Sequence, residues 1–126
     1  MYSINYSTHF DAAHFLKDYP GKCANIHGHR WEVGVQVSGE QLNEIGILID
    51  FNDLKRYLKE ITETLDHKLI NDLSYFSKIN PTAENIAKYL YDLLKGKINK
   101  EFPDLILDFV EVWEAPQSKA IYTEGS

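Results

Sequence analysis

The sequence has little of several features that define large classes of proteins. It contains one cysteine, so no disulfide can form within the chain, which is typical of a reducing compartment. No apolar run approaches the roughly 20 residues of a membrane-spanning helix, and no basic stretch followed by an apolar one opens the sequence. Lysines and arginines number 13 against 19 acidic residues, a net charge of −6. We therefore expect a cytoplasmic protein that binds neither membranes nor nucleic acid.

The size and composition are those of one ordinary globular domain. The 126 residues are 44% hydrophobic and 25% charged, and the chain is too short for two independent cores. It contains no linker, low-complexity segment or internal repeat. We therefore predict a single domain over residues 1–126.

Strands are predicted where apolar and polar residues alternate, because successive side chains of a strand point to opposite faces. Four segments fit strands of this kind: residues 2–10, 31–37, 105–113 and 118–124. The first two have a loop with Pro20 and Gly21 between them, and the last two follow Pro103. The strands therefore lie in two groups, one near each end of the chain.

Between the two groups, apolar residues recur at spacings of three and four, which predicts helices. One helix is expected over residues 54–65, and a second over residues 83–94 with Gly96 as its stop. This order predicts an α+β fold, a four-stranded antiparallel sheet with both helices on one face. An open sheet has two unpaired edges, so we also expect the protein to oligomerise through them.

Three of the five histidines have the spacing of metal ligands. His27 and His29 are two residues apart, so in an extended segment both imidazoles point to one face. His14 lies at the other end of the intervening loop and comes close if the first two strands form a hairpin. Three neutral imidazoles with an open fourth position are the usual layout of a catalytic zinc site. The alternative is strand-end histidines with satisfied hydrogen bonds; we favour metal binding and assign His9 no function.

Cys23, four residues before His27, has three interpretations. It can be a fourth ligand that closes a Cys-His₃ site of purely structural function. It can stay off the metal as a thiolate base or nucleophile. It can also be a small buried hydrophobic residue. The spacing alone favours none of these.

Three further positions have both a functional and a structural interpretation. Asp66 beside His67 can fix the tautomer of the imidazole for acid–base chemistry, although a solvated helix terminus is the commoner explanation. Glu114 ends a buried row of residues, where a carboxylate needs a donor partner such as a ligand with two adjacent N–H groups, or it reaches solvent at an edge. Thr82 and Glu84 are interpreted first as helix-start residues.

Several segments together resemble the 6-pyruvoyl-tetrahydropterin synthase family, most closely its queuosine-pathway branch, the 6-carboxy-tetrahydropterin synthases. They are Phe10-Asp11-Ala12-Ala13-His14, Cys23-Ala24-Asn25-Ile26-His27-Gly28-His29, Gly46-Ile47-Leu48-Ile49-Asp50-Phe51, Leu65-Asp66-His67, Asn80-Pro81-Thr82-Ala83-Glu84-Asn85 and Trp113-Glu114. The resemblance covers nearly the whole chain. Its most specific part is the Cys-x₃-His-Gly-His block with a distant His and an Asp-His pair.

The resemblance implies a tunnelling fold (T-fold), in which sheets join edge to edge in a trimeric barrel and two barrels stack into a hexamer. It places active sites at subunit interfaces. It also implies these residue roles: zinc binding by His14, His27 and His29, proton transfer by Cys23, Asp66 and His67, and pterin binding by Glu114. Thr82 is a further candidate for substrate binding.

The implied substrate is 7,8-dihydroneopterin triphosphate. Carbon–carbon cleavage would give 6-carboxy-tetrahydropterin and acetaldehyde, whereas triphosphate elimination with internal redox would give 6-pyruvoyl-tetrahydropterin. The three-residue gap between Cys23 and His27 resembles the carboxy-forming branch. Lys22, Arg30 and Lys68 are candidates to hold the triphosphate. The alternatives are a non-catalytic module with a closed Cys-His₃ zinc site, and a pterin-binding relative with another reaction, such as an aldolase-like cleavage.

Overall fold

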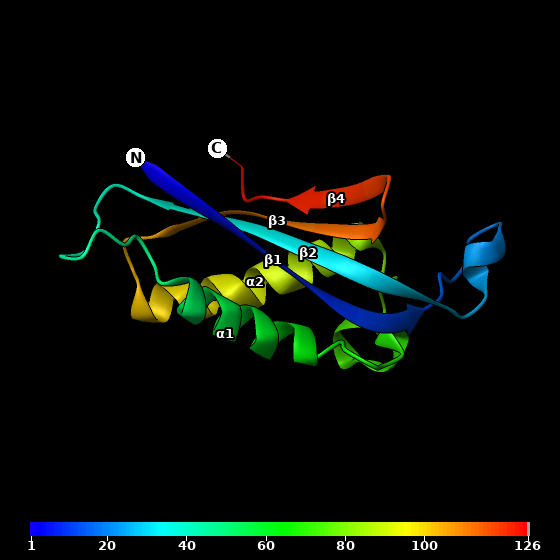
Figure 1. The fold of residues 1–126 in the computed structure, drawn as a ribbon. Helices are drawn as coiled ribbons and strands as arrows, with labels where there is room; N and C mark the ends of the chain where they lie inside the picture. Colours follow the sequence, from blue (N-terminus) through cyan, green and yellow to red (C-terminus); the bar gives the residue numbers. More distant parts are fainter. Residues whose placement is uncertain (126) are drawn as a thin grey trace.

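The four strands form one antiparallel sheet, and both helices lie across a single face of it (Figure 1). The computed structural model describes residues 1–125. The strands are β1 (Tyr2–His14), β2 (His27–Gly39), β3 (Ile106–Ala115) and β4 (Ser118–Tyr122), in the spatial order β1-β2-β3-β4, and the helices are α1 (Phe51–Glu63) and α2 (Ala83–Glu101). This arrangement confirms the predicted α+β fold.

The first hairpin is longer than the hydrophobic pattern indicates. β1 and β2 pair without interruption from Tyr2 opposite Gly39 to His14 opposite His27. The prediction had ended the first strand at residue 10 and begun the second at residue 31. The extra residues are small or polar, so they carry no apolar alternation, although their backbones continue the hydrogen-bonded ladder. The hairpin that was expected to bring His14 to His27 is therefore present.

The core lies between the helices and the inner face of the sheet. On β2 the inner residues are Trp31, Val33, Val35 and Val37, all buried. Phe10 of β1 stacks on Trp31, with ring centroids 5.9 Å apart. Both helices bury a stripe of aliphatic side chains, which includes Leu54, Leu58 and Ile61 of α1 and Ile86, Leu90 and Leu94 of α2. The last residues of each strand that point to the helix-covered face therefore lie at the edge of this core.

The two ends of α2 show one confirmed and one wrong prediction, and α1 begins and ends slightly earlier than the predicted 54–65. Thr82 is the N-cap of α2, and its hydroxyl accepts the backbone N–H of Asn85 at 3.1 Å. Gly96 does not stop the helix, which runs on to Glu101. The Cβ position of Gly96 is open to solvent, and the cost of about 1 kcal/mol for glycine in a helix is offset because the next turn buries Ile98.

The long connection between the helices runs beside the outer edge of β1. It contains two 3₁₀ turns, Ile70–Asp72 and Ser74–Phe76. Ala13 pairs with Leu69 in a parallel bridge, and its N–H donates to Lys68 O at 3.0 Å. This connection and the loop between β1 and β2 therefore meet at the same end of the sheet.

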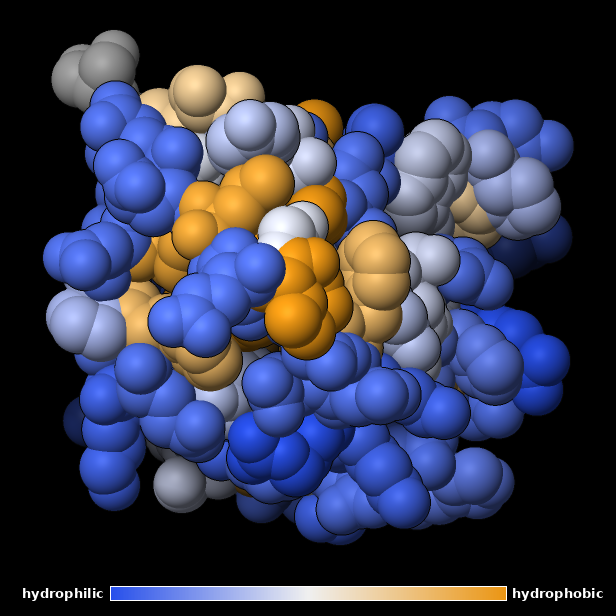
Figure 2. Space-filling model, turned by 60° about the vertical axis from the view of Figure 1, so that its left-hand side comes forward, coloured by the Kyte–Doolittle hydropathy of each residue, from blue (hydrophilic) through white to orange (hydrophobic). Residues whose placement is uncertain are grey.

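The opposite end of the sheet carries an apolar patch, seen in Figure 2. There the start of β1 and the connection from β2 to α1 line a groove of about 440 Å³. Its exposed apolar residues include Tyr2, Leu42 and Phe51, and Ile45 nearby is 80% exposed. Within residues 1–125 we find no helix both long enough and apolar enough to cross a membrane.

Candidate metal centre

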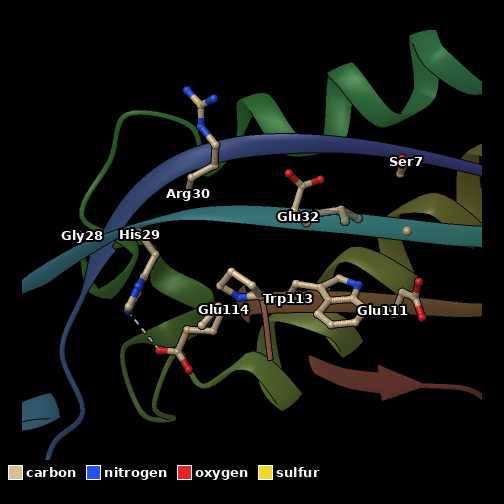
Figure 3. Close-up of a pocket in the computed structure, with 12 residues that line it drawn as sticks. Ser7, Gly28, His29, Arg30, Glu32, Glu111, Trp113 and Glu114 are labelled. Carbon is tan, nitrogen blue, oxygen red and sulfur yellow. Dashed lines mark ion pairs between the residues drawn. The ribbon is translucent and has the colours of Figure 1, made fainter. Parts of the chain in front are cut away.

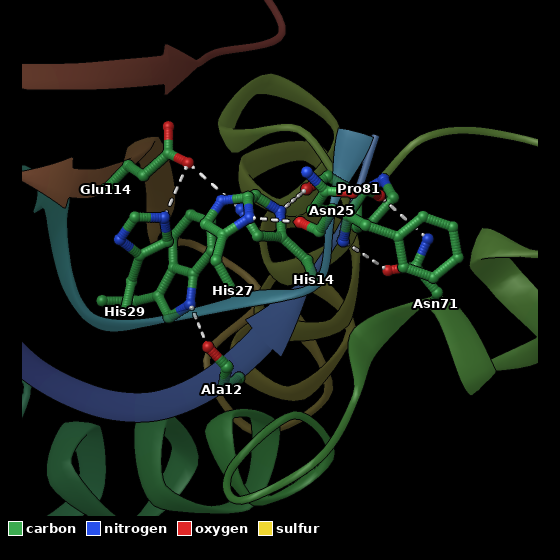
Figure 4. A network of polar contacts seen from close by, with 10 residues as sticks. Ala12, His14, Asn25, His27, His29, Asn71, Pro81 and Glu114 are labelled. Atoms are coloured by element: carbon green, nitrogen blue, oxygen red, sulfur yellow. Dashed lines mark hydrogen bonds and ion pairs between the residues drawn. The ribbon is translucent and has the colours of Figure 1, made fainter. Parts of the chain in front are cut away.

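Three histidines and one glutamate meet where the inner face of the sheet ends (Figure 4). His14 lies opposite His27 in the β1–β2 ladder, and His29 follows on the same face of β2. Glu114 reaches them from the end of β3. One potential ligand atom of each of the four lies within 4.8 Å of the others. The predicted convergence of the three histidines is thus observed.

The spacing of these atoms suits a small cation. Glu114 Oε1 lies 3.1 Å from His14 Nε2 and 3.1 Å from His29 Nε2. In a tetrahedral zinc site, ligand atoms about 2.0–2.1 Å from the metal lie roughly 3.3 Å from one another. Three imidazole nitrogens and a carboxylate oxygen are also a donor set that zinc accepts. The donor set and the two short distances therefore fit a small cation such as zinc.

Hydrogen bonds to the backbone fix two of the imidazoles. His14 Nδ1 donates to Pro81 O and His27 Nδ1 donates to Asn25 O, each at 2.7 Å (Figure 4). With the proton on Nδ1, each ring keeps the lone pair of Nε2 for a ligand. Among the described residues, the buried Nε2 atoms of His14 and His29 have no hydrogen-bond partner, despite their proximity to Glu114. A cation between these atoms would satisfy them.

Burial disfavours the protonated form of two of the imidazoles. It lowers the pKa of His14, whose side chain is 1% exposed, and the pKa of His29, while the nearby Glu114 carboxylate opposes both shifts. Histidine binds a metal in its neutral form, so a lowered pKa removes the competition from protons near pH 7. The electrostatics of the cluster therefore favour a cation.

Two cavities open beside the cluster, and Glu114 lines both. One, of about 440 Å³, is lined by His14, Cys23 and Thr82 among others. The other, of about 870 Å³, lies over the helix-free face of the sheet and exposes Trp113 (Figure 3). The Glu114 side chain is 32% exposed. A molecule in either cavity can reach this carboxylate.

Cys23 shares a cavity with His14 but is not part of the four-residue cluster. It lies in a 3₁₀ turn, Lys22–Ala24, in the loop between β1 and β2, and is half-buried. Its carbonyl accepts the N–H of Leu16 at 2.7 Å, which ties this loop to the end of β1. The fourth donor that the structure brings to the histidines is Glu114. The geometry is therefore that of a thiol beside the candidate metal centre.

Asp66 and His67 form a second cluster at the edge of the sheet. Asp66 Oδ2 lies 3.0 Å from His67 Nδ1, and Asp66 Oδ1 accepts the backbone N–H of Asp11 at 2.9 Å. The N–H of His67 donates in turn to Asp11 O at 2.6 Å. His67 has φ of +58°, a left-handed conformation that is uncommon for residues other than glycine. The main chain of β1 therefore holds the pair in place.

This second cluster is open to solvent. The side chain of His67 is 78% exposed. Its potential ligand atom lies close to those of Asp11 and Asp66, and it is not part of the group formed by the other three histidines and Glu114. The N–H of Asp11 lowers the pKa of Asp66, with a further contribution from His67. Asp66 is therefore an anion at neutral pH and can orient the imidazole.

The candidate triphosphate ligands differ in their contacts. Arg30 is paired with Asp11, with Nε 3.0 Å from Oδ1 and Nη2 3.3 Å from Oδ2. Within residues 1–125, Lys22 and Lys68 form no ion pair with a carboxylate. The two lysines are therefore available to bind a triphosphate, whereas the arginine is already paired with a carboxylate.

The contact between Glu114 and the histidines was not anticipated. The signal was present, because Glu114 has the same strand parity as the buried residues Val110 and Val112 and so belongs to the inner face. What the sequence could not supply was the register of β3 against β2, which decides how far along that face Glu114 lies. A bulge between Trp113 and Ala115 further adjusts its position.

The chain belongs to the family described as 6-pyruvoyl tetrahydropterin synthase, whose sequence profile it matches over residues 3–125. A Bacillus subtilis protein named 6-carboxy-5,6,7,8-tetrahydropterin synthase is 33% identical over 96% of this chain and 84% of that protein. A Haemophilus influenzae protein of the same name is 31% identical over 98% of this chain and its own full length. The human 6-pyruvoyl tetrahydrobiopterin synthase is 38% identical over 81% of this chain and 70% of that protein.

Solved structures share the fold. The Caenorhabditis elegans 6-pyruvoyl tetrahydropterin synthase superposes with a TM-score of 0.87 at 27% identity, covering 98% of this chain and 96% of that one. The 6-pyruvoyltetrahydropterin synthase of Plasmodium vivax gives a TM-score of 0.74 at 20% identity, covering 97% and 98%. The resemblance of the sequence segments to this family is thereby confirmed.

Proposed function

We propose that the protein is a zinc-dependent lyase that converts 7,8-dihydroneopterin triphosphate to 6-carboxy-5,6,7,8-tetrahydropterin, with release of acetaldehyde and triphosphate. The observation that carries this proposal is the convergence of His14, His29 and Glu114 atoms at 3.1 Å, beside two cavities, in a chain of this family. The relatives named as 6-carboxy-tetrahydropterin synthases match nearly the whole chain and support this branch.

A second reaction is suggested by the human relative named 6-pyruvoyl tetrahydrobiopterin synthase, which is 38% identical over 81% of this chain. An Archaeoglobus fulgidus relative named as a putative 6-carboxy-5,6,7,8-tetrahydropterin synthase is equally identical, over 75% of this chain, so identity does not separate the two reactions. Triphosphate elimination without carbon–carbon cleavage is therefore the alternative. Against it stands the three-residue gap between Cys23 and His27, which resembles the carboxy-forming branch.

In the proposed reaction His14, His27 and His29 hold the zinc ion, which would lower the pKa of the substrate's side-chain hydroxyls. The backbone bonds to Pro81 and Asn25 keep the Nε2 lone pairs directed at one point. Burial lowers the pKa of His14 and of His29, which reduces the competition of protons with the ion at these two ligands. The chain thus contributes a site that needs little reorganisation on metal binding.

Cys23 and the Asp66–His67 pair move the protons. Cys23 takes a proton from a side-chain carbon of the substrate, for which its place in the cavity of His14 is suitable. His67, oriented by the anionic Asp66, returns protons to the side chain or the ring. In one chain this pair forms a cluster separate from the metal centre, which supports a site completed by the pair of a neighbouring copy.

Glu114 binds the pterin ring, with Thr82 as a weaker candidate in the same cavity. A carboxylate accepts two adjacent N–H groups, and the 2-amino and ring N–H groups of a pterin have this arrangement. Glu114 is accessible from both cavities, so a ring in either one can meet it. Lys22 and Lys68 remain the candidates for the triphosphate.

We further propose that the subunits assemble through the outer edges of β1 and β4 into a trimeric barrel, and that two barrels form a hexamer. Both strands are edges of the four-stranded sheet, and an apolar groove lies beside the start of β1. Size-exclusion chromatography with light scattering should give a multiple of the monomer mass. A mass near 15 kDa at micromolar concentration would overturn this assembly.

The decisive experiment is a product assay. The zinc-loaded protein is incubated with 7,8-dihydroneopterin triphosphate, the pterin product is identified by mass, and acetaldehyde is measured enzymatically. A 6-carboxy product with stoichiometric acetaldehyde is expected. A 6-pyruvoyl product without acetaldehyde would establish the alternative reaction, and unchanged substrate would overturn both.

A further inference from the structure

The stretch that follows β1 is held like an internal strand, although no strand lies on its outer side. Phe15 N–H donates to Asn71 Oδ1 at 2.9 Å, and Asn71 Nδ2 donates back to Phe15 O at 3.0 Å. Two residues later, Lys17 N–H donates to Asn80 Oδ1 at 2.9 Å, and Asn80 Nδ2 donates to Lys17 O at 3.0 Å. Each side-chain amide thus replaces the peptide group of a neighbouring strand.

The other side of the same stretch carries the candidate site. His14 pairs with His27 across the hairpin, and Leu16 N–H donates to the carbonyl of Cys23 at 2.7 Å. Alternate residues therefore bond to opposite sides, as in any strand. The hydrogen bonds that hold Phe15 and Lys17 on the outer side of this stretch therefore also fix the backbone of His14 and the loop of Cys23 on its other side.

Asn80 is tied to the metal centre by a second route. The next residue, Pro81, is buried and accepts the Nδ1 proton of His14 at 2.7 Å. The carbonyl of Asn80 itself accepts Asn85 Nδ2 at 2.9 Å, which anchors it to the first turn of α2. The chain is therefore closed into a ring, from His14 along the stretch after β1 to Lys17, across to Asn80, and back through Pro81 to the His14 imidazole.

We propose that Asn80, assisted by Asn71, is a positioning residue of the metal centre. The two amides hold the backbone on which His14 is mounted and fix the carbonyl that sets its tautomer, so Nε2 points to the other ligand atoms before the metal arrives. Both amides are engaged by the main chain of Phe15 and Lys17 through their oxygen and their nitrogen. This inference rests on the metal centre of the proposed function.

A matched control is available at the other end of α2. Asn99 Nδ2 donates to the backbone carbonyls of Phe102 and Leu105, at 3.5 and 3.0 Å. It too is half-buried and bonds main chain across a loop, but it lies in the last turn of α2, at the end opposite Thr82, which shares a cavity with His14. Asn99→Ala therefore removes a bond of the same type without disturbing His14.

The test measures metal affinity on full-length, metal-free protein. Zn²⁺ and Co²⁺ are titrated in competition with a chelator, and the Co²⁺ absorption spectrum reports the ligand geometry. Loss of groups that orient a metal ligand typically costs 10–100-fold in affinity. We expect Asn80→Ala to raise the Kd of both ions about 10–100-fold and to alter the cobalt spectrum, Asn71→Ala to change the Kd less in the same direction, and Asn99→Ala to leave it within twofold.

Each other outcome has a definite meaning. If Asn80→Ala and Asn71→Ala bind both ions like the unmodified protein, the inference is overturned while the metal centre stands. Equal weakening in Asn99→Ala would also overturn it, because the effect would then be general destabilisation. If Asn80→Ala does not fold, Asn80→Asp decides, since it keeps the acceptor for Lys17 N–H and loses the donor; unmodified affinity in that variant overturns the inference. An unmodified protein that binds neither ion would instead refute the proposed metal centre itself.

Discussion

Residues 1–125 contain two clusters in which a carboxylate meets an imidazole, and the imidazoles of the two clusters differ chiefly in burial. In the first, Glu114 faces His14 and His29, whose side chains are 1% and 27% exposed. In the second, Asp66 contacts His67, which is 78% exposed. The same pair of functional groups is thus placed once at the end of the core and once at the edge of the sheet.

The difference shows how one chemical pair can take two roles. Burial lowers the pKa of His14 and of His29, so they remain neutral and keep their lone pairs for a metal. At the edge, a backbone N–H lowers the pKa of Asp66, so this carboxylate stays charged beside an exposed imidazole. The proposed ligand set and the proposed proton relay therefore differ in their solvent exposure.

The largest expected effect comes from breaking the first cluster and leaving the second intact. His29→Ala removes one of the proposed direct ligands, so zinc affinity should fall by more than the roughly 100-fold that substitutions of outer residues cost. His67→Ala is the matched control, because it also removes an imidazole from a carboxylate contact. Chelator competition measures both. Equal zinc affinity in the two variants would refute the assignment of the metal centre to the first cluster.

The second-largest expected effect tests whether Cys23 acts in proton transfer and not in metal binding. Cys23→Ala should lower kcat by about 10²–10⁴-fold, the usual contribution of a proton-transfer group, while zinc content and thermal stability stay unchanged. Turnover and bound zinc are measured on the same preparation. If this variant loses zinc and unfolds, a closed structural site containing Cys23 is the correct interpretation, because such sites contribute directly to folding.

Glu114→Gln tests whether this carboxylate binds the pterin ring of the substrate or the metal ion. A charge-assisted hydrogen bond is worth about 1.5–3 kcal/mol, so kcat/KM should fall roughly 10–100-fold, mostly through KM. Zinc affinity should fall less than in His29→Ala. A loss of zinc as large as in that variant would make Glu114 the fourth ligand instead of a substrate anchor.

Much of the fold and of the first cluster was predictable, because both depend on local periodicity. The alternation in β2 and the spacing of His27 and His29 are properties of a single strand, and the hairpin then brings His14 opposite. The same reasoning gave the helix start at Thr82. The wrong stop at Gly96 shows its limit, since the tertiary packing of Ile98 outweighed a local signal.

The second cluster was less predictable, because it depends on contacts between distant segments. Adjacent positions suggested Asp66 and His67, but nothing in the sequence indicated that Asp11, 55 residues earlier, would bond to both through its main chain. Almost every residue has the same main-chain N–H and C=O groups, so a contact to the main chain leaves no signal in the sequence. The amides of Asn71 and Asn80 were unforeseen for the same reason, since their partners are also backbone atoms.

The smallest expected effect is a pH dependence of stability from the second cluster. The folded-state pKa of Asp66 lies below its ordinary value of 3.8, chiefly because of the Asp11 N–H, so the unfolded state binds the proton more readily. The stabilisation is present above the ordinary value and is lost as the pH falls through the lowered one. The stabilisation is small, because the carboxylate is more than one-third exposed.

Urea unfolding of metal-free protein at pH 7, 5, 4 and 3 measures this effect. The difference in the free energy of unfolding between the unmodified protein and Asp66→Asn should shrink only in the most acidic range. The first cluster is the same in both proteins, so its contribution cancels in the difference. A difference that is constant from pH 7 to 3 would mean that the folded protein does not favour the ionised form of Asp66.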